Sequence, residues 1–275
     1  MVEIGKLLSE GKGKRVYETN DPKTAVVYFK DEALAYHGLK RGRILGKGEV
    51  NNAVCAHLYR MLAEKGIENH FIEQLDARQS LVKRAEIIPI TIKVRNRVAG
   101  SLGARIGMET GTKLDSTIVE IVLRDEYLEN PVINKTHILA MHLATSEEVD
   151  FMVETSLKVN EILTEYMADI GVELVDFKLE YGRYEGRVLL VDEIDADTSR
   201  FWDARTHEPM DIDRFRRDLG NVEQAYQDLL HRMMGDKYLH FQRCRNVSVA
   251  FSCIRYNYHR NESCIFDFAD VYCMR

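Results

Sequence analysis

Apolar and polar residues alternate with a period of two in several short runs of the chain, which predicts β-strands. The first two runs are separated by the turn signal Asn20-Asp21-Pro22. A later stretch, 174–193, predicts two strands joined by a turn near Gly182 to Gly186. The first two runs are residues 15–17 and 24–29, and further strand-like runs cover residues 71–72, 80–83, 87–95 and 117–123.

Three other segments repeat their apolar residues at helical spacing. The first is predicted to begin with Asn51 as its cap and to stop at Gly66. The second begins at Thr145, which forms a capping-box pattern with Glu148. The last covers roughly residues 211–234.

This order of elements predicts an α+β fold in three parts. Residues 1–84 form a mostly-β lobe with one helix, and residues 85–234 form a larger α+β lobe. Residues 235–275 form an atypical tail, which we expect to be an accessory extension. It holds four of the five cysteines without a C-x-x-C pair, so a zinc site has little support.

Composition narrows the class of protein. The chain has 275 residues, of which 45% are hydrophobic and 30% charged, as in ordinary globular proteins. A net charge of -6 gives no reason to expect a nucleic-acid partner. No apolar run suits a membrane span, and the first residues do not resemble a signal peptide. With an odd cysteine count, these features predict a cytoplasmic protein without a disulfide framework.

The segment 175–180 carries the most informative charges. As a strand it places Asp176, Lys178 and Glu180 on one face and apolar residues on the other. The apolar run that follows ends at Asp192, where an unpaired buried charge would be costly. Two carboxylates on adjacent strands suit Mg²⁺ beside a phosphate. The alternative is a solvated sheet face, and the sequence leaves the strand register open.

Two glycine-containing basic segments are candidates for anion binding. Lys12-Gly13-Lys14 precedes a strand, where turn N–H groups and two ammonium groups could hold a polyphosphate. Arg95 and Ser101 follow a strand and suit a phosphate or carboxylate. A solvated basic hairpin and a charged surface loop remain the alternatives. The chain lacks Walker-type and Rossmann patterns.

Taken together, these segments resemble the SAICAR synthetase family of purine biosynthesis. The matching pieces occur in the family's order over about residues 8–234: GKGKRVY (11–17), GKGEVNN (46–52), VRNRVAGS (94–101), VDFKLEYG (175–182), VDEIDADTSRFWD (191–203) and DRFRRDLG (213–220).

The resemblance implies a two-lobed, kinase-like layout with mostly antiparallel sheets and ATP in a cleft between the lobes. It also implies ligation of L-aspartate to the carboxylate of aminoimidazole ribonucleotide (CAIR), giving SAICAR, ADP and phosphate through an acyl phosphate. Homodimers or higher homo-oligomers are expected from the family. The rivals are a kinase-like phosphotransferase and a non-catalytic nucleotide-binding protein.

The resemblance also assigns roles to single residues. Two positions depart from the family's usual residues: Asn130 stands where Asp is common, and Arg124 where Lys is common. The implied roles are ATP binding by Lys12, Gly13, Lys14, Lys83 and Arg124; CAIR binding by Arg95, Ser101 and Arg200; Mg²⁺ binding by Glu180 and Asp192; and catalysis by Asp176 and Lys178.

Overall fold

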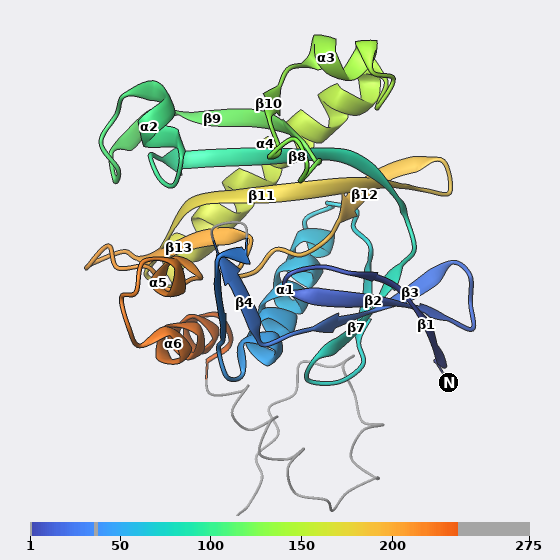
Figure 1. Ribbon diagram of the computed structural model, residues 1–275, viewed down its shortest axis with the longest axis horizontal. Helices are drawn as coiled ribbons and strands as arrows, with labels where there is room; N and C mark the ends of the chain where they lie inside the picture. The colour runs from blue at the N-terminus through green and yellow to red at the C-terminus, as the bar shows by residue number, and fades with distance from the viewer. Residues whose placement is uncertain (1, 36–37, 236–275) are drawn as a thin grey trace, which may run out of the picture. The chain divides into compact units, whose positions relative to one another are not determined.

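The computed structural model of the chain describes residues 2–35 and 38–235 (Figure 1). A boundary between two units of the chain falls after Gly235. The predicted tail therefore lies outside the described residues, except for Gly235 itself, which caps the last helix.

The first half of the chain builds a five-stranded antiparallel sheet in the order β1-β2-β3-β7-β6. A separate two-stranded sheet pairs β4 with β5. The predicted strands at 15–17, 24–29, 71–72 and 80–83 all belong to the five-stranded sheet. The first strand of that sheet, β1, was not predicted from the sequence. The strand bounds are β1 Ile4–Glu10, β2 Lys14–Thr19, β3 Thr24–Phe29, β4 Glu32–Ala35, β5 Lys40–Arg43, β6 Phe71–Gln74 and β7 Gln79–Lys83.

A six-stranded antiparallel sheet follows. Five of its strands lie in the order β10-β9-β8-β11-β12, and the sixth, β13, pairs with β11 (Figure 1). The long strand β11 pairs with β8 along one edge. Its other edge is shared, because β13 pairs with its first half and β12 with its second. The bounds are β8 Glu86–Arg97, β9 Lys113–Leu123, β10 Val132–Ile133, β11 Val172–Tyr184, β12 Arg187–Val191 and β13 Ser199–Asp203.

The helices cover these sheets. Helix α4 packs against β11 and β8, and α1 packs against β3, β6, β7 and α6. The capping box predicted at the start of α4 is confirmed. The side chain of Thr145 accepts a hydrogen bond from the backbone N–H of Glu148, and the side chain of Glu148 accepts one from the backbone N–H of Thr145. The bounds are α1 Lys47–Glu64, α2 Leu102–Ile106, α3 Lys135–Ala140, α4 Ser146–Asp169, α5 Asp213–Arg216 and α6 Val222–Met234.

Helix α1 begins one turn earlier than predicted. Asn51, the expected cap, is buried inside the helix, and Gly46 is the N-cap without a side-chain cap of its own. The carboxylate of Asp31 accepts the backbone N–H of Gly48 at 3.0 Å. A distant residue therefore satisfies a free N–H group of the first turn, which a search for local caps cannot find.

The last predicted helix is two helices. Asp218, Gly220 and Asn221 have φ values of +54°, +70° and +49°, so the chain turns between α5 and α6. Glycine and asparagine tolerate this left-handed conformation. The apolar spacing on either side of the turn imitated one continuous helix.

The observed architecture is α+β with mainly antiparallel strands, as predicted. The inner faces are fully buried, for example at Ile90, Ile92, Val175 and Leu163. Among the described residues, no helix is both long and apolar enough to cross a bilayer.

Candidate active site

Strand β11 presents alternating charges beside charged neighbours on both of its edges. Asp176 lies opposite Arg95 of β8 and opposite Arg200 of β13. Two residues further on, the ammonium of Lys178 lies 3.5 Å from Oε1 of Glu180. The predicted charged face therefore exists, and it is not a solvated surface, because Asp176 and Glu180 are each only 5% exposed.

Asp192 joins this face through a turn of the backbone. Its neighbour Val191 lies opposite Glu180, so strict alternation would send the Asp192 side chain to the other face. Asp192 has a φ of +70°, which ends the alternation. Its Oδ2 lies 3.6 Å from the Lys178 ammonium. The ammonium of Lys178 thus lies within 4 Å of both predicted metal carboxylates.

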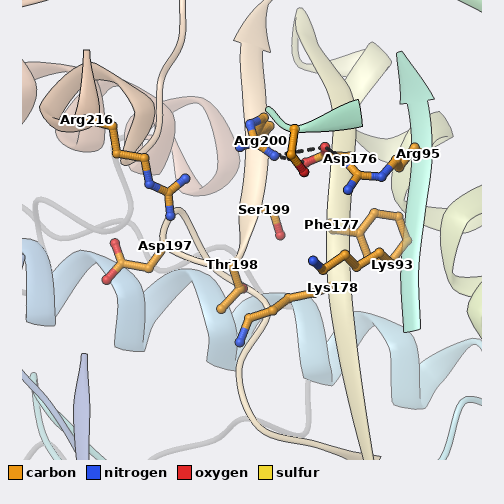
Figure 2. A pocket seen from close by; sticks show the side chains of 11 residues that line it. Lys93, Arg95, Asp176, Phe177, Lys178, Asp197, Thr198, Ser199, Arg200 and Arg216 are labelled. Carbon is orange, nitrogen blue, oxygen red and sulfur yellow. Dashed lines mark hydrogen bonds and ion pairs between the residues drawn. The ribbon is translucent and has the colours of Figure 1, made fainter. Parts of the chain in front are cut away.

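Asp176 is held between two guanidinium groups (Figure 2). Arg95 donates from Nη1 to Oδ2 at 2.7 Å, and Arg200 donates to both oxygens at 2.9 Å. Glu120 accepts a hydrogen bond from Nε of Arg95 at 2.6 Å, and Asp213 accepts one from Nε of Arg200 at 2.7 Å. Burial opposes the charge of Arg200, but the two carboxylates outweigh it and raise its pKa. Both arginines are therefore fixed in place before any ligand binds.

A pocket of about 280 Å³ lies against this network. Five cationic side chains and only two carboxylates contribute to its wall, so it suits an anion. The predicted residues Arg95, Ser101, Asp176, Lys178 and Arg200 all line it. Its other lining residues are Lys93, Phe177, Asp197, Thr198, Ser199 and Arg216.

The predicted phosphate-binding hairpin reaches the same neighbourhood from the first sheet. Lys14 forms ion pairs with Asp192 and Glu193. Burial opposes the charge of Glu193, but Lys14 and then Lys178 outweigh it and lower its pKa. Lys12 is more exposed and pairs with Glu126 at 2.6 Å. The hairpin is therefore tied to the carboxylate cluster by charge.

Of the other two predicted ATP-binding residues, Arg124 contacts this carboxylate cluster and Lys83 contacts other residues. Nε of Arg124 lies 3.1 Å from Oε2 of Glu180, so the arginine adds a third cation to the carboxylates. Lys83 instead donates to the backbone oxygen of Asn69 at 3.2 Å and lies 3.6 Å from Glu68. Neither residue lines the pocket.

A buried group behind the hairpin was not singled out from the sequence. The ammonium of Lys47, whose side chain is fully buried, forms an ion pair with Asp197. The hydroxyl of Tyr226 donates to the other oxygen of Asp197 at 2.7 Å. A Cβ placed on Gly13 would lie 3.3 Å from Oδ2 of Asp197, so the hairpin backbone approaches the same carboxylate. Residues of helices α1 and α6 thus anchor Asp197, which also lines the pocket.

The residues present fit a divalent cation of the magnesium type. Glu180 and Asp192 share the ammonium of Lys178, which shows that their carboxylates converge on a place for positive charge. Mg²⁺ takes one or two carboxylates and completes its shell with phosphate oxygens and water. Among the described residues, no group of three or more acidic, histidine or cysteine side chains is placed to hold a metal ion by itself.

Comparison with known proteins agrees with these observations. The family profile of SAICAR synthetase matches residues 7–233. The phosphoribosylaminoimidazole-succinocarboxamide synthase of Coprothermobacter proteolyticus is 49% identical over 228 residues, covering 82% of this chain and 97% of that protein.

Solved structures give the same result. The crystal structure of the synthase from Ehrlichia chaffeensis is 38% identical, with a TM-score of 0.81, over 83% of this chain and 98% of that one. A SAICAR synthetase in complex with ADP has the same identity and TM-score, over 84% and 98%. With most of its length matched in sequence and in structure, the chain belongs to the SAICAR synthetase family.

Proposed function

We propose that the protein ligates L-aspartate to the carboxylate of CAIR with ATP, giving SAICAR, ADP and phosphate. The single observation that carries this is the continuity of two charged groups on β11. The cationic pocket around Asp176 would hold the phosphate of CAIR. Further along β11, Lys178 and Glu180 meet Lys14 and Asp192, which come from other segments. A substrate with a phosphate at one end and a carboxylate at the other fits this arrangement.

The site residues divide between the two ends of the substrates. Arg95 and Arg200 present N–H groups that would bind the CAIR phosphate, together with the hydroxyl of Ser101. Asp176 is best suited to positioning the two arginines, because both its oxygens already accept hydrogen bonds from them. Lys12, Gly13 and Lys14 would lie over the ATP phosphates.

Glu180 and Asp192 would hold Mg²⁺, which neutralises phosphate charge and aligns the γ-phosphoryl group. The ammonium groups of Lys178 and Lys14 and the guanidinium of Arg124 lie close to these carboxylates. Burial opposes the charge of Lys178, but Glu180 and Glu193 outweigh it and raise its pKa. Lys178 therefore stays cationic beside the reacting groups, where it would stabilise negative charge. Lys83 and Arg124, which do not line the pocket, would bind the nucleotide from outside it.

The chemistry requires two displacements. A CAIR carboxylate oxygen attacks the γ-phosphorus, the bond to the β-phosphate oxygen breaks, and ADP leaves. The aspartate amine then attacks the acyl carbon and loses a proton, and inorganic phosphate leaves with the electrons of the broken C–O bond. A free carboxylate has no good leaving group, so the phosphorylation makes the amide possible. Arg95 and Arg200 would contribute by holding CAIR in position for both displacements.

A coupled ADP-release assay with CAIR, run with and without aspartate, tests this proposal. We expect ADP release that depends on aspartate, and a product with the mass of SAICAR. Equal ADP release without aspartate would indicate the kinase-like alternative. No turnover with CAIR would exclude the ligase. We also propose a cytoplasmic location, supported by the buried free thiol of Cys55 and these intracellular substrates, and a homodimer or higher homo-oligomer, which gel filtration tests.

A further inference from the structure

The pocket wall holds two carboxylates, and they differ in how far their acceptor positions are used. Asp176 accepts three hydrogen bonds from the two arginines that flank it. Asp197 pairs with Lys47 through Oδ2 and accepts from Tyr226 through Oδ1. A carboxylate offers about four acceptor positions, so Asp197 keeps about two of them. Its side chain is 20% exposed, against 7% for Asp176. Asp197 is therefore the carboxylate of this wall that can accept hydrogen bonds from a ligand.

Neither anchor of Asp197 lines the pocket. Lys47 is the first residue of α1 and has a fully buried side chain, and Tyr226 of α6 is 1% exposed. Burial opposes the charge of Lys47, but nearby carboxylates, that of Asp197 first, outweigh it and raise its pKa. The carboxylate of Asp197 is thus held in place by two groups that a ligand in the pocket does not contact.

A guanidinium group lies in the same part of the pocket. Arg216, the last residue of α5, lines the pocket and has a side chain that is 33% exposed. Its Nη1 donates to Oδ1 of Asp213 at 2.7 Å, which helps to fix the side chain. Figure 2 shows Arg216 extending toward Asp197, to one side of the arginines around Asp176. A group suited to a cation and a group suited to an anion therefore lie beside each other.

The chemistry of the proposed substrates indicates which ligand fits such a pair. ATP and CAIR bring phosphates and a carboxylate, all of them anionic. The ammonium of L-aspartate is the one cationic group that the three substrates bring, and a carboxylate is attached to the same carbon atom. An acidic and a basic side chain placed beside each other match these two charges of an amino acid.

The pair also lies close to the proposed reaction centre. The backbone N–H of Lys178 donates to the backbone oxygen of Thr198, the residue after Asp197, at 3.2 Å. Lys178 and Thr198 both line the pocket. An amino group bound to Asp197 would therefore share the pocket with the cation proposed to stabilise charge on the reacting carboxylate.

We propose that Asp197 and Arg216 form a clamp for the amino-acid substrate. Asp197 accepts hydrogen bonds from the α-amino group, and Arg216 binds the α-carboxylate. This inference rests on the proposed ligase function. It adds the groups that orient the nucleophile, whereas Arg95 and Arg200 orient the acceptor.

The test measures the KM for each substrate in Arg216→Gln and Asp197→Asn. We expect the KM for aspartate to rise about 10-fold or more in each variant, because a charge-assisted hydrogen bond is lost. The KM values for CAIR and ATP should change less than about 2-fold, since neither substrate contacts the clamp. Arg217→Gln is the matched control, because Arg217 is exposed and does not line the pocket, and it should alter no constant.

Two analogues assign the ends of the clamp. Succinate is aspartate without the amino group, and β-alanine is aspartate without the α-carboxylate. Both are measured as inhibitors that compete with aspartate. In Asp197→Asn the Ki of succinate should stay unchanged while the KM for aspartate rises. In Arg216→Gln the Ki of β-alanine should stay unchanged while that of succinate rises. Losses for both analogues equal to the loss for aspartate in both variants would overturn the assignment.

A double variant separates binding from folding. Asp197→Asn leaves the buried ammonium of Lys47 without its carboxylate, which weakens the fold. Lys47→Met combined with Asp197→Asn removes the whole ion pair and should show the same rise in the KM for aspartate. An unchanged KM for aspartate in Arg216→Gln and in the double variant overturns the clamp. Absence of aspartate-dependent turnover in the unmodified protein would instead reject the ligase function.

Discussion

Nη1 of Arg200 donates to both carboxylate oxygens of Asp176, at 2.9 Å each. Asp176 is buried, and its Oδ2 also accepts from Arg95. A single carboxylate thus sets the orientation of two guanidinium groups on opposite neighbouring strands.

Replacement of Asp176 by Asn tests this positioning role. The amide keeps the shape but loses the charge and one acceptor, so both arginines lose orientation. We expect kcat/KM for CAIR to fall at least about 10-fold. Unfolding in urea should show a loss of about 1–3 kcal/mol, limited because Glu120 and Asp213 still hold the arginines. Unchanged CAIR kinetics would contradict the role.

The variant Asp192→Asn addresses the proposed metal site. The carboxylate contacts Lys14 and Lys178, and it would supply one ligand to Mg²⁺. We expect kcat to fall at least about 100-fold at saturating substrates, with the fold intact by circular dichroism. Glu185→Gln, at an exposed pair with Lys23, is the control and should be fully active. Near-normal turnover of Asp192→Asn would rule out the metal role.

Acid should destabilise the protein through His70. Burial first, and then the nearby charge of Lys14, lowers its pKa from 6.5 to about 3, while Glu193 acts in the opposite direction. Between these values the unfolded chain binds a proton that the folded protein does not, so stability falls as the pH falls. From pH 7 to pH 5 this contributes a loss of about 2 kcal/mol. Urea unfolding of His70→Gln should show a loss smaller by that amount, and an identical loss would disprove the assignment.

Gly48→Ala should be destabilising although alanine normally favours a helix by about 1 kcal/mol over glycine. A Cβ at this position would lie 2.4 Å from the backbone oxygen of Phe29 and 2.6 Å from Arg78. The helix would have to move away from β3, and we expect a loss of about 2–4 kcal/mol. At Gly11, the nearest atom to an added Cβ is 3.9 Å away, so Gly11→Ala should change the unfolding free energy by less than about 0.5 kcal/mol.

The fold was predictable where local rules decide it. The Thr145–Glu148 capping box and the alternation in β11 depend on neighbours in sequence, and both are confirmed. The start of α1 was not predictable, because Asp31 caps it from a distance.

The site shows the same division. The charges on β11 were visible in the sequence, but the placement of Asp192 required the register with Val191 and the left-handed turn. Lys93 had an available signal, because it has the same strand parity as Arg95 and therefore shares its face. Lys47 and Asp197 meet only through tertiary packing, so no sequence rule would have paired them.

A Cβ placed on Gly13 would lie 3.3 Å from Oδ2 of Asp197, so the hairpin backbone comes close to this carboxylate. The side chain of Asp197 also forms part of the wall of the pocket. Under the proposed function, nucleotide bound at the hairpin would lie next to a side chain that also lines the pocket. Any synergy between ATP and the second substrate would then have a local origin, at a carboxylate already anchored by Lys47 and Tyr226.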